Sequence, residues 1–595
     1  MGAFFLYKNN ADIDSHAVES VFRKKGFQNP KIFNLNGITL WLYKKQLIDV
    51  DNYIVKADGP ALFATGTIIY KGLSYRESLR NILEDHLGGQ LDYEELLGNY
   101  CLIFYDGRKI KILTDRLCSY HLFIDTNKTR ISSSFLALMR SFKSVLKINQ
   151  MAFYEKISRG YIIGPDTLVS SIQQISPELM SSLTDSEFAF IPHKKVIEIT
   201  TCAAKFDDCV AQQIYLLKSR VKSIKSLADE YGADLGLSSG YDSRLLLLLC
   251  LNLGFRVSAH THLTFGTDHL KSYEIVEELG RKCNIELRAV KTKLLSLHNE
   301  ELLREILTDG LYYFDGRNSR DMGAFSETYT RAYKIRTLGN YRLSLNGQAG
   351  EIYRNYFHTS RKIFNFGHWM RHHAFFENID NFMGSKKYYE DTKNFIIDKI
   401  KSRIGGKLDG NADLLTIRKY YGFVHVPDSE TNINDAHNQL TFYLTPFIDI
   451  SLINASLSII PHIGISGRFE TAMIKILDPE IAAVNSHYGF PFSQEPLSHK
   501  LKNWVKGYTP DSFFNWIVKY KMQYKNLGTI HLEEYLGMVK RSKIMREIDE
   551  ALFDFYPNID WHSITRDNTA RRTVVFMGSF LREFGSLFHT TGEYQ

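Results

Sequence analysis

A six-residue segment near the middle of the chain carries the clearest chemical signal. It follows an apolar stretch that ends at Leu237, and its residues are Ser238, Ser239, Gly240, Tyr241, Asp242 and Ser243. The glycine permits a tight turn, and the start of a helix offers unpaired backbone N–H groups to an anion. The serine hydroxyls add donors, and the Asp242 carboxylate can hold Mg²⁺. The segment is a candidate cradle for a pyrophosphate and its metal ion.

A simpler interpretation of this segment is a serine-rich helix N-cap, which is common in α/β proteins. The segment is not a phosphate loop of the G-x-x-x-x-G-K-[ST] type. Transfer of a γ-phosphate is therefore not the chemistry that we expect from it.

The elements around the segment suit a nucleotide site. Apolar residues between 206 and 227 recur every three or four positions, which predicts an amphipathic helix. After it we expect a strand at 234–237, the turn, a leucine-rich helix at 243–253, a strand at 256–263 and a helix at 271–282. This order is typical of an open parallel α/β sheet. The change of pattern puts a domain boundary between 195 and 205, and the rest of the chain looks mostly helical.

The first 195 residues look β-rich instead. We expect strands at 39–43, 61–70, 100–105 and 109–114, with a helix at 75–87. Asp106-Gly107 lies between the last two strands and predicts a hairpin.

The composition excludes several classes of protein. The chain has 595 residues, too many for one core, and its 44% hydrophobic content excludes a disordered chain. A net charge of +7 gives no dedicated nucleic-acid signature, and the longest apolar run, 245–251, is too short for a bilayer. The six cysteines show no zinc-ligand spacing and are expected as free thiols in a cytoplasmic protein.

Several motifs in order along the chain carry a family resemblance. The cradle differs from the fingerprint SGGxDS at Ser239, and the segments 343–353 and 446–449 are similar to G-[DE]-G-[AS]-D-E-x-F and PFLD. Upstream, the segments 98–106, 114–116, 132–138 and 161–168 are similar to GxFAFxxxD, RDR, FASExKAL and GYVPGPxTL. Together they resemble the asparagine synthetase B family over most of the chain.

The resemblance implies a mixed α+β and α/β fold. Residues 1–200 would form an αββα domain of the Ntn-hydrolase type. Residues 201–595 would form a PP-loop (adenine-nucleotide α-hydrolase-like) synthetase domain with a helical C-terminal part. The cofactors would be ATP and Mg²⁺. The family's nucleotide-binding positions correspond to Leu237, Ser238, Ser239, Gly240, Asp242, Ser243 and Gly347. Asp242 and Glu351 would bind the metal, and Asp242, Glu351 and His487 would act in catalysis.

The sequence departs from the family at three places. Where glutamine-hydrolysing members have a nucleophilic cysteine, this chain has Gly2. The first domain therefore resembles the inactive amidotransferase domain of β-lactam synthetases and lasso-peptide cyclases. The loop 347–351 is one residue short, so either Gly350 or Glu351 replaces a metal-binding aspartate, and we prefer Gly350. On that basis Gly350→Asp would strengthen Mg²⁺ binding. His487 stands near the position of a basic residue, and a surface histidine is an equal alternative.

Three functions remain open. The first is an AMP-forming amide ligase without glutaminase activity, which joins a small-molecule or peptide carboxylate to an amine donor. The second is an asparagine-type synthetase that uses free ammonia, and the third is a non-catalytic scaffold. We expect no nucleic-acid or membrane partner, and a homodimer is compatible with the resemblance. The basic aromatic stretch 354–376 could bind a polyanion or a leader peptide, although helices with solvated basic faces have the same pattern.

Overall fold

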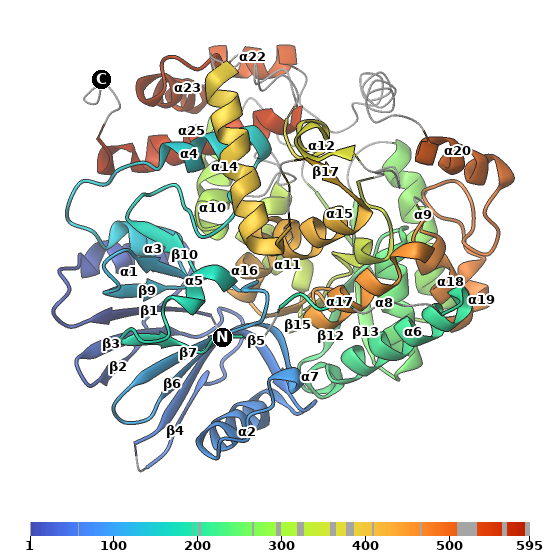
Figure 1. Ribbon diagram of the computed structural model, residues 1–595, viewed down its shortest axis with the longest axis horizontal. Coiled ribbons are helices and arrows are strands. Elements are labelled where there is room, and N and C mark those ends of the chain that lie inside the picture. The colour runs from blue at the N-terminus through green and yellow to red at the C-terminus, as the bar shows by residue number, and fades with distance from the viewer. Residues whose placement is uncertain are drawn as a thin grey trace.

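The computed structural model describes residues 2–589, apart from positions 58, 194–195, 200–203, 264–266, 293–298, 318–326, 358–363, 377–385, 407, 409, 465–466, 509–531 and 562–567. It is a mixed α and β structure (Figure 1). Two antiparallel-rich sheets lie in the N-terminal part of the chain, and a parallel sheet surrounded by helices lies in the remainder.

The N-terminal sheets contain most of the first 190 residues. The first sheet has the order β10-β8-β9-β1-β3-β2, and its strands are β1 (Ala3–Lys8), β2 (Lys31–Leu35), β3 (Ile38–Tyr43), β8 (Phe123–Asp125), β9 (Arg130–Ser132) and β10 (Ile172–Gln174). The second has the order β11-β7-β6-β5-β4, and its strands are β4 (Tyr53–Val55), β5 (Ala61–Tyr70), β6 (Leu96–Tyr105), β7 (Ile110–Thr114) and β11 (Phe188–Phe190). The predicted strands, the hairpin β6–β7 and the helix α2 (Tyr75–Leu87) are confirmed.

Alternation along the strands explains how these sheets pack. Phe4 and Leu6 of β1 belong to a core shared with Phe63 of β5, whereas Phe5 belongs to a core on the opposite face. On that opposite face lie α1 (Ser15–Lys24), whose Phe22 stacks on Tyr43 at 4.3 Å, and α3 (Phe135–Arg140). Helix α2 packs on the other side of β5. The order of layers is helix, sheet, sheet, helix.

The second part of the chain is built on five parallel strands. Their order is β14-β13-β12-β15-β18, with bounds β12 (Ala233–Gly236), β13 (Val257–Leu263), β14 (Leu287–Lys291), β15 (Leu343–Leu345) and β18 (Phe442–Leu444). The predicted strands β12 and β13 and the helices α8 (Tyr241–Asn252) and α9 (Thr267–Lys282) are confirmed. The single helix expected at 206–227 is wrong, because the chain forms α6 (Phe206–Lys222) and then α7 (Lys225–Tyr231).

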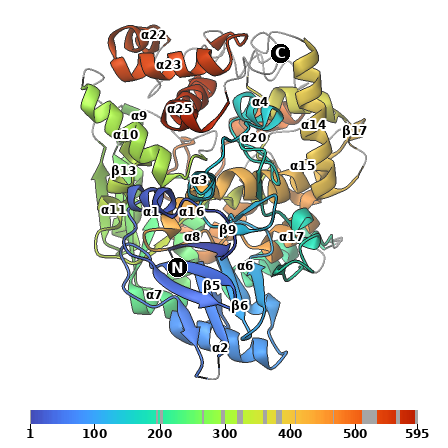
Figure 2. The same cartoon turned by 90° about the vertical axis from the view of Figure 1, so that its left-hand side faces the viewer.

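The remaining helices cover this sheet and the N-terminal part. Figure 2 shows α23 and α25 beside α22 at one end of the molecule, and α25 contacts both α4 and α10. Their bounds are α4 (Gln150–Arg159), α5 (Pro177–Ser181), α10 (Glu300–Tyr313), α11 (Arg331–Leu338), α12 (Phe366–His373), α14 (Lys386–Ile404), α15 (Leu414–Tyr420), the π-helix η4 (Tyr421–Glu430), α16 (Asn432–Asn438), α17 (Ile450–Ser458), α18 (Arg468–Leu477), α19 (Pro479–Ala482), α20 (Leu497–Tyr508), α22 (Leu532–Arg541), α23 (Lys543–Phe555) and α25 (Asn568–Phe584). In the described parts of the chain, no helix has the length and apolarity needed to cross a membrane.

Buried ion pairs join the N-terminal sheets to the second half. Lys25 Nζ lies 2.6 Å from Asp315 Oδ1, and both side chains are almost fully buried. Asp435 accepts from Arg317 at 2.6 Å and contacts His121 Nδ1 at 2.5 Å. Charges buried at such a boundary are stable only when paired, so the two halves are fixed against each other.

Candidate functional site

The predicted cradle lies where the order of the parallel strands reverses. From β12 the chain continues to β13 on one side, whereas β15 is followed by β18 on the other side. The loops that leave the carboxyl ends of β12 and β15 therefore lie next to each other. In open α/β sheets such a switch point is the usual place for a ligand.

The first of these loops has the conformation of an anion site. Leu237 N donates to the carbonyl of His260 at 2.8 Å, which fixes the entrance of the turn. The hydroxyls of Ser238 and Ser243 lie 2.9 Å apart, and Ser238 Oγ accepts from Gly240 N at 3.3 Å. The N-cap residue of α8 is Gly240, which has no side chain to cap the first turn of that helix. The N–H groups of this turn are available to an anion.

The second loop presses against the first turn of α8. A Cβ at Gly347 would lie 2.8 Å from the carbonyl carbon of Asp242 and from the nitrogen of Ser243. This approach requires a glycine. Gln348 N donates to Asn346 Oδ1 at 2.8 Å, which shapes the loop. The predicted cofactor residues of the turn and Gly347 of the second loop are thus brought to one place.

Asp242 and Glu351 also lie close together, because both carboxylates accept hydrogen bonds from the same arginine, Arg354. Arg354 donates from Nη1 to Asp242 Oδ1 and from Nη2 to Asp242 Oδ2, both at 2.9 Å. Its Nη2 also donates to Glu351 Oε1 at 2.8 Å, and its Nη1 to Glu470 Oε1. The side chain of Asp242 is only 20% exposed. Asp242 is therefore a paired and largely buried carboxylate.

Burial shifts the proton affinities of this cluster. Burial and the Asp242 charge raise the pKa of Glu351 to about 7, against the effect of Arg354. Burial raises the pKa of Glu470 well above its usual range. Burial opposes the charge on Arg354, but Glu470, Asp242 and Glu351 outweigh it and raise the pKa of the guanidinium. The arginine is therefore the fixed charge of the cluster, and the two glutamates are the groups that can take up protons.

The oxygens of this cluster do not fit the Mg²⁺ that the resemblance implies. Both Asp242 oxygens accept from Arg354, so the positive charge of a guanidinium lies directly against them and would repel a second cation. Over the described part of the chain, no three His, Cys, Asp or Glu side chains are arranged to hold a metal ion. Metal ligation by Asp242 and Glu351 is therefore not supported by their geometry.

Gly350 leaves no room for the aspartate that would complete a metal site. A Cβ at this position would lie 2.1 Å from Asp242 Oδ1 and 2.5 Å from its Cγ. Gly350→Asp would therefore displace Asp242 instead of joining it. The expectation that this change strengthens Mg²⁺ binding has no steric basis.

His487 lies beside the cradle. A Cβ on Gly240 would be 3.5 Å from His487 Cε1, and the imidazole also faces the Ser239 backbone. Loss of surrounding water, with Arg354 and Arg244 nearby, lowers the pKa of His487. His487 is exposed, as the alternative of a surface histidine expects, and a lowered pKa does not favour the cationic role that the resemblance suggests.

Arg244, Arg354 and Glu470 were not predicted as site residues. Arg244 is fully buried, and its guanidinium donates to the carbonyls of Val484 at 2.9 Å and Asn485 at 2.8 Å. It thereby holds the segment that carries His487 against α8. The available sequence signal was a charge directly before the apolar run 245–251, because a charge at the start of a buried helix needs buried partners.

Position 2 has no space for a nucleophilic side chain. A Cβ on Gly2 would lie 2.2 Å from the Lys44 carbonyl oxygen and 2.8 Å from Phe27 Cε1. We expect Gly2→Cys to release no glutamate from glutamine and to lower the free energy of unfolding by about 2 kcal/mol, because the core must expand. Glutamate release and urea unfolding measure both effects. Gly410→Cys is the control, since a Cβ there meets nothing within 4 Å. Glutaminase activity of the Gly2 variant would contradict this expectation.

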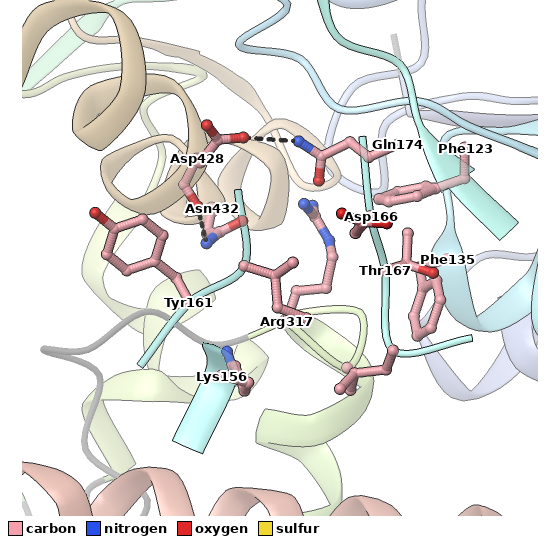
Figure 3. Close-up of a pocket in the computed structure, with 13 residues that line it drawn as sticks. Phe123, Phe135, Lys156, Tyr161, Asp166, Thr167, Gln174, Arg317, Asp428 and Asn432 are labelled. Atoms are coloured by element: carbon pink, nitrogen blue, oxygen red, sulfur yellow. Dashed lines mark hydrogen bonds between the residues drawn. The ribbon is translucent and has the colours of Figure 1, made fainter. Parts of the chain in front are cut away.

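A separate cavity lies between the two halves of the chain (Figure 3). Its described lining residues do not include Asp242, Glu351 or His487. Asp428 accepts from Gln174 Nε2 at 3.1 Å at its edge, and Lys156 and Arg317 bring two cationic side chains to it. The polar groups that line the cavity therefore come from both halves of the chain.

A chain of hydrogen bonds connects this cavity to the second loop of the cradle. Tyr161, which lines the cavity, contacts His425 Nδ1 through its hydroxyl at 3.0 Å. His425 Nε2 lies 3.1 Å from Glu430 Oε1, and Glu430 Oε2 accepts from Gln348 Nε2. The intermediate residues lie on the π-helix η4, a conformation that is frequent at functional sites. These hydrogen bonds link the cavity to the loop that contacts Asp242.

Lys156 gives the cavity a measurable pH dependence. Burial and Arg317 lower the pKa of Lys156 to about 7, against Glu155. The unfolded chain keeps this proton up to about pH 10.4, so unfolding takes up a proton between pH 7 and 10, and stability rises with pH there. Below pH 7 the burial penalty is fully present. Lys156→Met should therefore raise the free energy of unfolding at pH 6 by about 3 kcal/mol and give less gain at pH 9.5.

Urea unfolding at pH 6 and 9.5 measures this difference. Lys500→Met is the control, because Lys500 is exposed and should show no pH-dependent gain. An equal gain at both pH values for the Lys156 variant would mean that packing, and not charge, causes the effect.

No family model matches the chain, and no curated protein matches it significantly.

Proposed function

We propose that the chain is an ATP-dependent amide ligase that adenylates a substrate carboxylate. The observation that carries the proposal is the cradle at residues 238–243, with an uncapped helix start and serine hydroxyls at the switch point of a parallel sheet. A carboxylate oxygen would attack the α-phosphorus of ATP, and the bond to the β-phosphate would break. Pyrophosphate would leave into the cradle, and an amine would then displace AMP to form the amide.

The proposal includes the finer fold assignment. The order helix, sheet, sheet, helix supports an amidotransferase-like first domain of the Ntn type, without glutaminase activity. The strand order β14-β13-β12-β15-β18, with the cradle after β12, supports a PP-loop synthetase domain. Both agree with the motif order in the sequence.

The chain's own groups would act mainly by position and charge. The first N–H groups of α8 would bind the departing pyrophosphate, with the Ser238 and Ser243 hydroxyls beside them. Arg354, held by Asp242, would provide fixed positive charge close to that place. No step is assigned to a metal ion on Asp242 or Glu351, since their oxygens accept from the guanidinium.

The carboxylate would belong to a small molecule or a peptide, and the amine would come from the substrate itself or from free ammonia. The identity of the amine separates a substrate-joining ligase from an ammonia-dependent synthetase.

A second candidate is a non-catalytic relative that keeps the cradle. One observation favours it: Arg354 pairs with both oxygens of the only acidic side chain in the turn. Exchange of labelled pyrophosphate into ATP distinguishes the two. Exchange that depends on a carboxylate substrate supports the ligase. ATP binding by equilibrium dialysis without exchange against any carboxylate in a broad panel supports the non-catalytic relative.

A further inference from the structure

The head group of Arg354 sits at the centre of the candidate site. Four of its N–H groups are directed at three carboxylates, those of Asp242, Glu351 and Glu470. The pair with Asp242 is bidentate, with two parallel contacts of 2.9 Å. This fork geometry matches a guanidinium and gives both specificity and strength.

The rest of the loop is built to hold this arginine in place. Arg354 directly follows the short helix η3 (Gly350–Tyr353), and its side chain is 14% exposed. The fully buried guanidinium of Arg418 donates to the carbonyls of Glu351, Ile352 and Arg354. Asn355 N donates to the Gly464 carbonyl at 3.1 Å. Arg354 is therefore anchored on both sides and is not a surface residue that rests on a carboxylate.

Gly350 and Arg354 depend on each other. Because a Cβ at position 350 would lie 2.1 Å from Asp242 Oδ1, only glycine lets the Asp242 carboxylate stand where Arg354 binds it. A carboxylate added at 350 would remove that arrangement. The short loop and the arginine therefore act together: Gly350 leaves room for the Asp242 carboxylate, and Arg354 balances the negative charge of the acidic residues.

We propose that the Arg354 guanidinium occupies the place of a divalent cation, so that this site binds the phosphates of its ligand with no metal ion on Asp242 or Glu351. The acidic cluster still needs a positive charge, because two or three carboxylates without one would be costly at this depth. The guanidinium meets that need permanently. The statement about phosphates rests on the function proposed above, whereas the statement about the metal does not.

Binding of Mn²⁺ to the nucleotide-free protein, followed by the EPR signal of free Mn²⁺, tests the metal statement. In the unchanged protein, Asp242 should not contribute to Mn²⁺ binding. The unchanged protein and Asp242→Asn should therefore bind the same amount of Mn²⁺. Arg354→Ala should gain one Mn²⁺ per chain, and the double variant Arg354→Ala with Asp242→Asn should lose it again. Arg354→Gln, which keeps most of the side-chain volume, replaces the alanine variant if that variant does not fold.

Two results would overturn the metal statement. One is a Mn²⁺ ion on the unchanged protein that Asp242→Asn abolishes. The other is a folded Arg354 variant that gains no Mn²⁺, since the acidic cluster would then not be a cation site at all.

Equilibrium dialysis of labelled ATP tests the phosphate statement. ATP should bind with a Kd that changes less than about threefold between excess EDTA and excess Mg²⁺, because no protein-bound metal contributes. Binding only in the presence of Mg²⁺ would overturn it. If ATP binds in neither condition, the proposed function fails, and the Mn²⁺ result alone still decides the role of Arg354.

Discussion

Replacing Asp242 by Asn is expected to lower carboxylate-dependent ATP–pyrophosphate exchange about a hundredfold, on the order of 3 kcal/mol in transition-state stabilisation. The side chain keeps its size, but it loses the charge that holds Arg354 beside the cradle. One of the two amide positions would present N–H groups to the guanidinium where an oxygen now accepts. The positive charge would therefore no longer be held firmly beside the cradle.

The same variant is expected to be less stable, by about 1–2 kcal/mol, because one partner of a largely buried charge pair is lost. Initial exchange rates and urea unfolding measure the two effects. Asp413→Asn is the matched control: Asp413 is exposed and caps the start of α15 by accepting from Thr416 N, a role that asparagine also fills. It should change neither quantity. Full exchange activity in the Asp242 variant would mean that the cradle has been assigned to the wrong residues.

The cradle could be predicted because its signal is local. Strand, turn and helix follow one another within 20 residues, and each has its own pattern of apolar residues and turn formers. The strands of the N-terminal sheets were predictable for the same reason. The strands β15 and β18 have only three residues each, all buried, and so show no alternation that a sequence pattern could reveal.

The charge arrangement at the site could not be predicted, because it depends on long-range contacts. Arg354 lies 112 residues from Asp242 and 116 from Glu470 along the chain. In the sequence, Arg354 looked like the first residue of a basic aromatic stretch. Part of that stretch, 358–363, lies outside the described residues, and α12 within it buries Phe366, Trp369 and Met370 like an ordinary amphipathic helix. Only the fold reveals that its first cation faces inward.

The helix expected at 206–227 failed for a different reason. Its apolar residues keep a three- and four-residue rhythm across the break between α6 and α7, and Val221, Ile224 and Leu227 are all buried. Periodicity reports which side chains face the core, and two consecutive helices that share a buried face give the same pattern as one. The break between α6 and α7 therefore cannot be predicted from the pattern of hydrophobic residues alone.

The largest loss of stability is expected from Asp315→Ala, at the boundary between the two halves. Asp315 is buried and lies two residues after the end of α10, in a left-handed conformation with φ of 57°. Its carboxylate accepts from Lys25 Nζ at 2.6 Å, from Ser134 Oγ and from Phe135 N at 2.5 Å each. The Asp315 side chain thus neutralises the buried Lys25 ammonium and accepts a hydrogen bond from the first backbone N–H group of α3.

Without that carboxylate, Lys25 would be left in a site where it is only 2% exposed, and the first N–H group of α3 would lose its acceptor. Breaking a buried ion pair by removing one partner costs about 3–5 kcal/mol. The midpoint of urea unfolding measures the loss. Asp49→Ala is the control, because Asp49 pairs with Lys44 in a fully solvated position and its removal should leave the midpoint unchanged.

A double variant separates the charge from the helix start. If the stranded ammonium causes most of the loss, Lys25→Met combined with Asp315→Ala should recover more than half of it, because no unpaired charge remains buried. The unrecovered part is the lost acceptor of Ser134 and Phe135, about 1–2 kcal/mol. If the double variant is no more stable than Asp315→Ala, the carboxylate acts on α3 alone, and the Lys25 pair does not hold the two halves together.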